Sequence, residues 1–250
     1  AYAARHGLYS ALLAAEGMTG PKPVFEGDLG YMRSISGPFT MPKLTSNAVR
    51  ILRTSIKWWP VEYHSMSAVE AALRIVSEAG RVKPSHVEKI VIRTFKTSYN
   101  IIVKDPEKWR PKSRETADHS LPYITIRALL DGDIWLESFS PEKISDMAFL
   151  ELAEKTIVEV EPGYDALYPE AVPNAVEVTL GDGRRYSAEV TYPKGHYRNP
   201  LTMDDLRRKV RRLTSGRLTD EQLDIIWDEV VSIDRLKSVR DLMDYLSTVK

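Results

Sequence analysis

The sequence contains no cysteine among its 250 residues, which excludes disulfide bonds, thiolate nucleophiles, iron–sulfur clusters and zinc sites built on cysteine. It has no excess of charge of either sign, because 35 lysines and arginines balance 35 aspartates and glutamates. We therefore expect no nucleic-acid partner and no acidic tail. The chain also lacks any apolar run near the ~20 residues that span a bilayer. A soluble, cytoplasmic protein without a membrane partner is expected.

What the sequence does contain is typical of a globular protein. Hydrophobic residues make up 43% and charged residues 28% of the chain, close to globular averages. A chain of this length hides roughly 70–75% of its unfolded surface, enough for a core without covalent staples.

The chain begins on a dense helical pattern without a capping residue before it. The opening AYAARHGLYSALLAAEGMTGP does not begin with Met and has no N-cap candidate and none of the regions of a signal peptide, and Gly17 ends the pattern. We expect a fragment whose partner elements lie upstream. The alternative is a processed or trimmed terminus on a complete protein.

Apolar periodicity divides the rest of the chain into elements. The stretch 21–42 is rich in Gly and Pro, which is typical of a functional or docking loop, and 104–115 is expected to be an exposed loop. Helices are expected at 46–56, 65–80, 117–132, 140–157, 199–213, 215–233 and 238–249. Strands are expected at 87–95, 157–162, 174–180 and 184–193, with a hairpin turn at 181–184.

The order of these patterns is a helix, then a mixed block, then helices again. This order favours an α+β fold over a doubly wound sheet. We expect one α+β domain at 52–199. The flanking ends, 1–51 and 200–250, are expected to belong to a second, mostly α-helical domain.

A lysine and a histidine stand near the two ends of the aromatic loop KWWPVEYHS (57–65), which leads into a helix. The N-terminal amides of a helix favour anions, and Lys57 adds a full positive charge. Lys57 and His64 therefore predict a carboxylate receptor, in which His64 can exchange a proton near neutral pH. The alternative is a packed loop, with both tryptophans in the core and Lys57 solvated.

A second histidine stands at a helix start in DHSLPY (118–123). His119 and Tyr123 are four residues apart and so share a helical face. An imidazole and a phenol together suit general acid–base catalysis. Equally, His119 could cap the helix while Tyr123 is half-buried.

A basic turn, YPKGHYRNP (192–200), follows the last strand pattern. Lys194, His196 and Arg198 are candidates for clamping a carboxylate, although a solvated turn that crosses between domains is the interpretation we favour. The basic run 207–212 indicates the charged face of an amphipathic helix. No His, Asp or Glu cluster has metal-ligand spacing, and no nucleotide, zinc-protease or hydrolase motif occurs, so no metal is expected.

Four ordered blocks resemble the MmgE/PrpD family, the 2-methylcitrate dehydratases and their relatives. The resemblance implies a cofactor-free lyase whose site lies between a helical domain, built from both chain ends, and an inserted α+β lid. It places Lys57 and His64 on the lysine and the histidine of one family block, and His119 and Tyr123 on its H-S-x-x-Y block. The blocks are AARHGLYSALLAAEGMTGP with FEG (25–27), KWWPVEYHSMSAVEAAL (57–73), DHSLPYITIRALLDG (118–132) and YPKGHYRNPLT (192–202).

The resemblance implies dehydration of 2-methylcitrate, because the decarboxylase relatives carry a histidine where this chain has Glu62. Lys57 and His64 would bind carboxylates and transfer protons, Tyr123 would donate a proton or a hydrogen bond, and His119 would orient it. The alternatives are cis-aconitate decarboxylation, iminodisuccinate epimerisation, and a catalytically silent fragment that serves as an assembly module. The expected partners are a small tricarboxylate, the N-terminal half of the same protein and a second copy in a homodimer.

Overall fold

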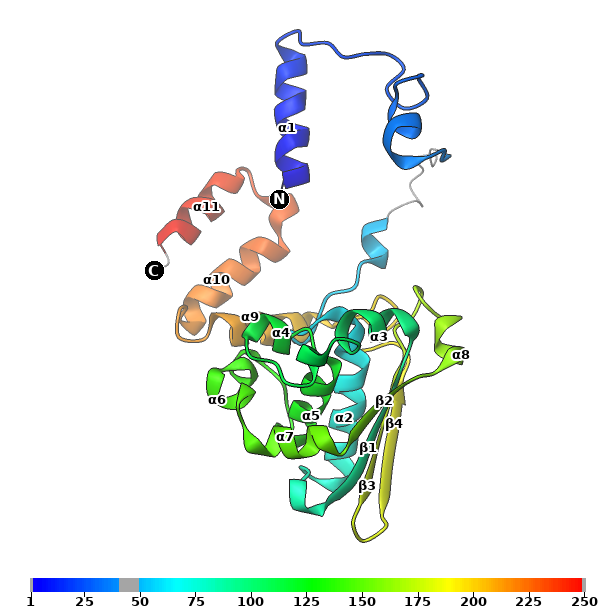
Figure 1. The fold of residues 1–250 in the computed structure, drawn as a ribbon. Coiled ribbons are helices and arrows are strands. Elements are labelled where there is room, and N and C mark those ends of the chain that lie inside the picture. The colour runs from blue at the N-terminus through cyan, green and yellow to red at the C-terminus, as the bar shows by residue number, and fades with distance from the viewer. Residues whose placement is uncertain (1, 41–49, 249–250) are drawn as a thin grey trace. The chain divides into compact units, whose positions relative to one another are not determined.

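A computed structural model describes residues 2–40 and 50–248, which belong to two compact units, Ala1–Arg50 and Ile51–Lys250 (Figure 1). The second unit contains the mixed sheet, which confirms the α+β class. The arrangement of an inserted domain within a helical domain, with boundaries at 52 and 199, stays a prediction.

The first unit begins with helix α1, Tyr2–Ala15, as the opening pattern predicts. The Gly- and Pro-rich stretch after it is less irregular than expected, because Met32–Ser36 form a π-helical turn. The rings of Phe25, Tyr31 and Phe39 pack edge to face, with centroids 6.2–6.4 Å apart. These rings give the stretch a small aromatic cluster of its own.

The helix expected at 46–56 lies partly outside the described residues, which resume at residue 50. The described part is a 3-10 turn, Arg50–Arg53, followed by an irregular segment up to the loop that contains Lys57. The helical prediction is therefore wrong for 54–56, is met at 50–53 only by the 3-10 turn, and lies outside the described residues at 46–49.

Four strands form one mixed sheet in the order β2-β1-β3-β4 (Figure 1). β1 pairs parallel with β2 and antiparallel with β3, and β3 pairs antiparallel with β4. The predicted hairpin between the last two strands is confirmed, with Gly183 at a φ of 87° in the turn. The strands are β1 (Val87–Thr94), β2 (Thr156–Val160), β3 (Asn174–Leu180) and β4 (Arg185–Val190).

Helices α2 (Met66–Ala79) and α5 (Leu121–Asp131) build the core together with the sheet. α2 packs against β3 and β4 on one side and against α5 on another. Its buried alanines, among them Ala68 and Ala72, present little volume, which lets the strands approach closely. Gly80, at a φ of 81°, ends α2 as the sequence predicts.

The helix expected at 140–157 is divided in two. α6 (Pro141–Ile144) ends before Asp146, whose Oδ1 accepts a hydrogen bond from the Ala148 amide at 3.0 Å and so begins α7 (Met147–Glu154). One residue, Lys155, separates the end of α7 from the start of β2. The predicted helix therefore contains the N-cap of a second helix in its middle. The spacing of apolar residues does not show such a cap, because the cap is a polar side chain that binds the backbone.

Several short helices and turns lie where the sequence predicted a loop or where no element was predicted. The exposed loop predicted at 104–115 contains a 3-10 turn, Pro106–Lys108, and the Trp109 indole donates to the Val103 carbonyl at 3.1 Å. The helix predicted at 117–132 begins only at Leu121, because the Ser120 hydroxyl caps it. The remaining short helices are α3 (Lys96–Ile102), α4 (Arg114–Ala117) and α8 (Pro162–Asp165).

Three amphipathic helices follow the sheet, as predicted. Thr202 and Thr219 form capping boxes at the starts of the first two. Arg212 of the first lies over the ring of Trp135, 4.0 Å from its centroid. Across the described residues, no helix is long and apolar enough to cross a membrane. The helices are α9 (Met203–Thr214), α10 (Asp220–Val231) and α11 (Val239–Thr248).

The chain passes twice through one place, on its way into the core at Ile56 and on its way out at Gly195. The Ile56 amide donates to the Gly195 carbonyl at 2.8 Å. Gly195 has a φ of 91°, and a Cβ at this position would collide with the Ile56 carbonyl oxygen. Only glycine fits this contact.

Candidate active site

His64 lies in a 3-10 turn, Tyr63–Ser65, immediately before α2, and Glu62 caps this turn. Glu62 Oε2 accepts a hydrogen bond from the His64 backbone amide at 2.8 Å, and Glu62 Oε1 lies 2.9 Å from His64 Nδ1. Burial alone would raise the pKa of Glu62, but hydrogen bonds and charge from His64 outweigh it and hold that pKa below its ordinary value. An ionised carboxylate therefore stands beside the imidazole at neutral pH.

A second histidine–carboxylate pair lies in the turn between α4 and α5. His119 Nδ1 is 2.6 Å from Asp118 Oδ1, and the imidazole is 54% exposed. The Glu62 backbone amide donates to the Asp118 carbonyl at 2.9 Å. The charge of His119 also acts on the Glu62 carboxyl, in the same direction as that of His64. The two histidine–carboxylate pairs are thus joined through the backbone.

Lys57 lies next to the first pair. Its Nζ donates to the Val61 carbonyl at 2.8 Å, one residue before Glu62. Lys209 of α9 donates from its Nζ to the Lys57 carbonyl, and burial, followed by the charge of Lys57, lowers the pKa of Lys209. The sequence predicted a charged helix face for the run that contains Lys209. The structure instead brings this cation to the loop that carries Lys57.

The backbone of His64 is anchored to the sheet by Asn174, which the sequence analysis did not identify. Asn174 is fully buried at the first position of β3, and its Nδ2 donates to the His64 carbonyl at 2.8 Å and to Ser67 Oγ at 2.7 Å. The His64 ring packs against Phe95 and Tyr168, with centroids 5.3 and 5.7 Å away. The one signal in the sequence is a polar residue where an apolar strand begins.

Tyr123 lies in the core. It does not share a helical face with His119, because α5 begins at Leu121 and His119 stands in the turn before it. The Tyr123 hydroxyl donates to the Ser138 carbonyl at 2.6 Å, its ring packs against Phe149, and burial raises its pKa well above the ordinary value. A part for Tyr123 in proton transfer stays a prediction.

The basic turn after β4 brings its three candidates together, but each of them already has a protein partner. Lys194 Nζ lies 2.6 Å from Asp205 Oδ1, and Arg198 lies 3.1 Å from Glu170 Oε2. His196 is buried, its Nδ1 accepts from the Arg198 amide at 3.1 Å, and burial, followed by the charge of Arg198, lowers its pKa. The turn is packed in its first part, where Gly195 and His196 are buried, and exposed from residue 198 to residue 200, so the solvated turn is met only in part. Its binding of a carboxylate stays a prediction.

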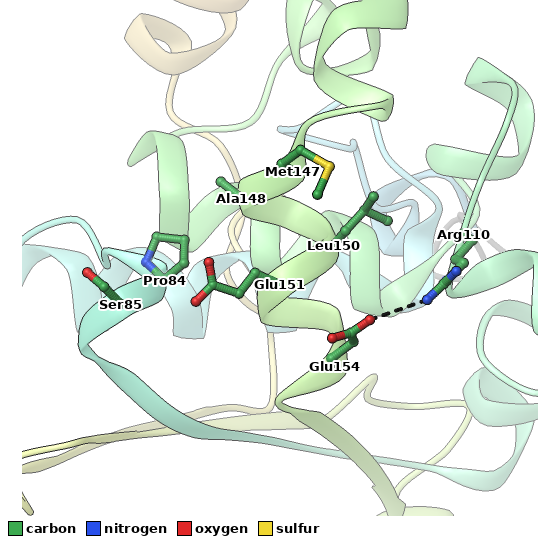
Figure 2. A pocket seen from close by; sticks show the side chains of 8 residues that line it. All are labelled: Pro84, Ser85, Arg110, Met147, Ala148, Leu150, Glu151 and Glu154. Carbon is green, nitrogen blue, oxygen red and sulfur yellow. Dashed lines mark hydrogen bonds and ion pairs between the residues drawn. The ribbon is translucent and has the colours of Figure 1, made fainter.

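A surface hollow lies beside α7, away from these groups in the sequence (Figure 2). Glu151 and Glu154 project from α7 into it, and Arg110 lies 3.3 Å from Glu154 at one edge. None of the sequence-predicted site residues line this hollow. Within the described residues, no three His, Asp or Glu side chains are grouped so that they could hold a metal ion. The lining residues are Pro84, Ser85, Arg110, Met147, Ala148, Leu150, Glu151 and Glu154.

Comparison with known proteins gives matches along most of the chain. The family model for the MmgE/PrpD C-terminal domain matches residues 59–233. Cis-aconitate decarboxylase of Homo sapiens is 29% identical over 255 residues, which cover 97% of this chain and 49% of that protein. Its counterpart in Mus musculus is 27% identical over 252 residues, covering 96% of this chain and 49% of that protein.

A dehydratase is similar over a shorter part. The 2-methylcitrate dehydratase of Salmonella typhimurium is 31% identical over 183 residues, which cover 68% of this chain and 37% of that protein. The chain thus spans about half the length of the decarboxylases that it matches and less of the dehydratase.

Proposed function

The chain belongs to the MmgE/PrpD family, and on this premise we propose that it supplies proton-transferring and carboxylate-binding residues of a lyase for a small polycarboxylate. The observation that carries the proposal is the hydrogen bond from the Glu62 amide to the Asp118 carbonyl, which joins the two histidine–carboxylate pairs. Lys57 adds a cation beside them.

The proposed chemistry exchanges a proton on a carbon skeleton and stabilises negative charge while a neighbouring bond breaks. His64 and His119 are the imidazoles that would give or take this proton. Lys57, with Lys209 next to it, holds a substrate carboxylate. Lys194 and Arg198 would add carboxylate contacts once their ion pairs open, and His196 once its hydrogen bond with the Arg198 amide opens. Tyr123 is left as a core residue.

Decarboxylation of cis-aconitate is the reaction that we place first, ahead of the dehydration that the family resemblance implied. The decarboxylases of human and mouse align with 97% and 96% of the chain. In this reaction a carbon–carboxylate bond breaks, carbon dioxide leaves, and the electron pair left on the carbon skeleton takes up a proton from an imidazolium. Lys57 would hold one of the two remaining carboxylates.

Dehydration of 2-methylcitrate is the second candidate, and Glu62 favours it. The family resemblance implies a histidine at this position in the decarboxylases, whereas this chain has a carboxylate. The Salmonella dehydratase is also slightly more identical, at 31%, although over 68% of the chain. Here a base removes a proton from carbon, and the hydroxyl group leaves as water after an acid protonates it.

The test is an assay of the full-length protein that carries this sequence. Cis-aconitate, 2-methylcitrate and iminodisuccinate are incubated with it separately, and the products are followed by proton NMR. Loss of carbon dioxide from cis-aconitate supports the first candidate, and loss of water from 2-methylcitrate alone supports the second. Turnover of none of them contradicts the proposal and favours the assembly module.

We also propose that the active species is a homodimer to which a helical N-terminal half contributes, as the family resemblance implies. Light scattering of the full-length protein measures its mass directly. A mass of twice the chain weight is expected, and a monomer that is fully active contradicts the proposed dimer.

A further inference from the structure

Both carboxylate oxygens of Glu62 are directed to one residue. Oε2 accepts from the His64 backbone amide at 2.8 Å, and Oε1 lies 2.9 Å from His64 Nδ1. The backbone contact fixes the carboxylate relative to the turn, so its second oxygen has a defined position against the ring. The exposed fractions of the two side chains, 13% for Glu62 and 14% for His64, leave little room for water to replace this contact.

The imidazole is also held from other directions. Phe95 and Tyr168 pack against it, and Asn174 binds the carbonyl of His64 at 2.8 Å. Rotation of the ring by half a turn would exchange Nδ1 for a carbon opposite Glu62 and would lose the ion pair in a nearly buried place. The ring orientation is therefore determined by the fold.

The charges around His64 come from few groups. Among its described ring neighbours, Phe95 is apolar, Tyr63 and Tyr168 are phenols, and Glu62 is the one carboxylate. Beyond them lie the Asp118–His119 pair, which the backbone bond ties to Glu62, and the ammonium of Lys57 at the Val61 carbonyl. The contact between Nδ1 and Oε1 is short but does not have the alignment of a hydrogen bond, and Nδ1 has no other hydrogen-bond partner among the described residues. Because Glu62 stays ionised at neutral pH, its negative charge at this distance favours a proton on Nδ1 over a lone pair.

We infer that Glu62 is a positioning residue, which keeps the proton of neutral His64 on Nδ1 and thereby presents Nε2 as the atom that gives or takes the proton in the reaction. The inference rests on the proposed function for the catalytic part and on the geometry alone for the tautomer. The carboxylate also stabilises the imidazolium that forms when Nε2 takes up a proton.

The variant Glu62→Gln tests this inference, because it changes hydrogen-bonding character with almost no change of shape. The glutamine oxygen can still accept from the His64 amide, and this places the NH2 group opposite Nδ1. Nδ1 must then accept, so the proton of the neutral ring moves to Nε2. We expect long-range ¹H–¹⁵N spectra to show Nδ1–H in the original chain and Nε2–H in Glu62→Gln.

Turnover gives the second measurement. Glu62→Gln is expected to lower kcat by about 10²- to 10⁴-fold with a small change in KM, because the wrong tautomer cannot accept a proton at Nε2. Glu62→Asp, which keeps a carboxylate, is expected to recover part of this loss together with Nδ1–H. The matched control is Glu151→Gln on α7, a carboxylate that pairs with Lys155 on the surface and is expected to leave both measurements unchanged.

The outcomes separate the inference from the proposed function. A neutral His64 protonated on Nε2 in the original chain overturns the inference without the need for any variant. An unchanged tautomer in folded Glu62→Gln overturns it as well. If the tautomer changes as expected while His64→Gln retains full turnover, the assignment of His64 in the proposed function fails, and the inference keeps only its structural part.

Discussion

The backbone amide of Glu62 donates to the carbonyl of Asp118 across 2.9 Å, although the two residues are far apart in the sequence. Each of them stands beside a histidine and contacts that histidine through its carboxylate. One backbone hydrogen bond thus holds the two histidine–carboxylate pairs next to each other. Loops between an enzyme's rigid elements commonly carry its chemistry, and here α2 and α5 supply the rigid support.

Lys57 is the first residue to test by substitution. If it holds a substrate carboxylate, Lys57→Met is expected to lower kcat/KM by about 10²- to 10⁴-fold. Steady-state kinetics on the acid that the proposed NMR assay shows to be turned over measures this effect. Lys89→Met, at an exposed position of β1, is the control and is expected to retain normal kinetics. A Lys57→Met protein with normal turnover removes Lys57 from the site.

Tyr123 gives a test that separates stability from catalysis. In Tyr123→Phe the buried Ser138 carbonyl loses the hydrogen bond that it accepts at 2.6 Å. We expect the free energy of unfolding to fall by about 1–2 kcal/mol, with kcat/KM changed by no more than a few fold. Urea denaturation and kinetics measure the two quantities. Unchanged stability together with lost turnover would instead make Tyr123 the proton donor that the sequence suggested.

Arg127 is the strongest test of the core. Its side chain is 2% exposed, with Nη1 2.8 Å from Asp146 Oδ2 and Nε 3.0 Å from Asp131 Oδ2. Arg127→Met removes the shared partner of two carboxylates, so we expect a loss of about 3–5 kcal/mol in the free energy of unfolding. Arg184→Met breaks an exposed ion pair with Asp182 and is expected to change stability little. Equal effects of both variants would contradict the buried network.

Asp205 predicts a dependence of stability on pH. A hydrogen bond from Lys194 outweighs burial and, with bonds from Thr202, lowers the pKa of Asp205 well below its ordinary value. A carboxyl whose pKa is lower in the folded state stabilises the fold above its unfolded pKa of about 3.9 and loses this effect as the pH falls further. Stability from this source is therefore expected at neutral pH.

The variant Asp205→Asn measures this effect. We expect it to lower the free energy of unfolding by about 1–3 kcal/mol at pH 7, and the difference from the original chain to shrink below about pH 4. Urea unfolding at pH 7, 5 and 3 gives the comparison, with Asp182→Asn as an exposed control. A difference that stays constant down to pH 3 would contradict the proposed ionisation.

The elements that the sequence predicted correctly are those in which the apolar pattern along the chain and the residues at the ends of the element indicate the same structure. α2 has a continuous apolar stripe and a glycine at its end, and β3 and β4 flank a Gly-containing turn, so periodicity and turn chemistry point the same way. The helix expected at 140–157 was divided because Asp146 caps a new helix inside the apolar pattern. The short helix α3 was missed because seven residues give too little periodicity.

The candidate site was predicted in part. Lys57 and His64 lie in one loop, as expected for two residues of the same nine-residue segment, 57–65. The contact of Glu62 with His64 is local, but it depends on the conformation of the turn that Glu62 caps. The hydrogen bond from Glu62 to Asp118 joins distant segments, which the spacing of residues in the sequence cannot reveal. Tyr123 was placed by counting four residues from His119, which fails because Ser120 delays the start of the helix.

The meeting of Ile56 and Gly195 has a consequence for protein engineering. Because the two crossings of the chain touch, residues 57–194 leave and return at one point, and a short peptide could bridge that gap. Such adjoining ends suit circular permutation, with new termini opened at the 181–184 hairpin, or transplantation of the whole segment into another host protein. Gly195 would have to be kept in the transferred segment, since any side chain there would collide with the Ile56 carbonyl oxygen and push the two ends apart.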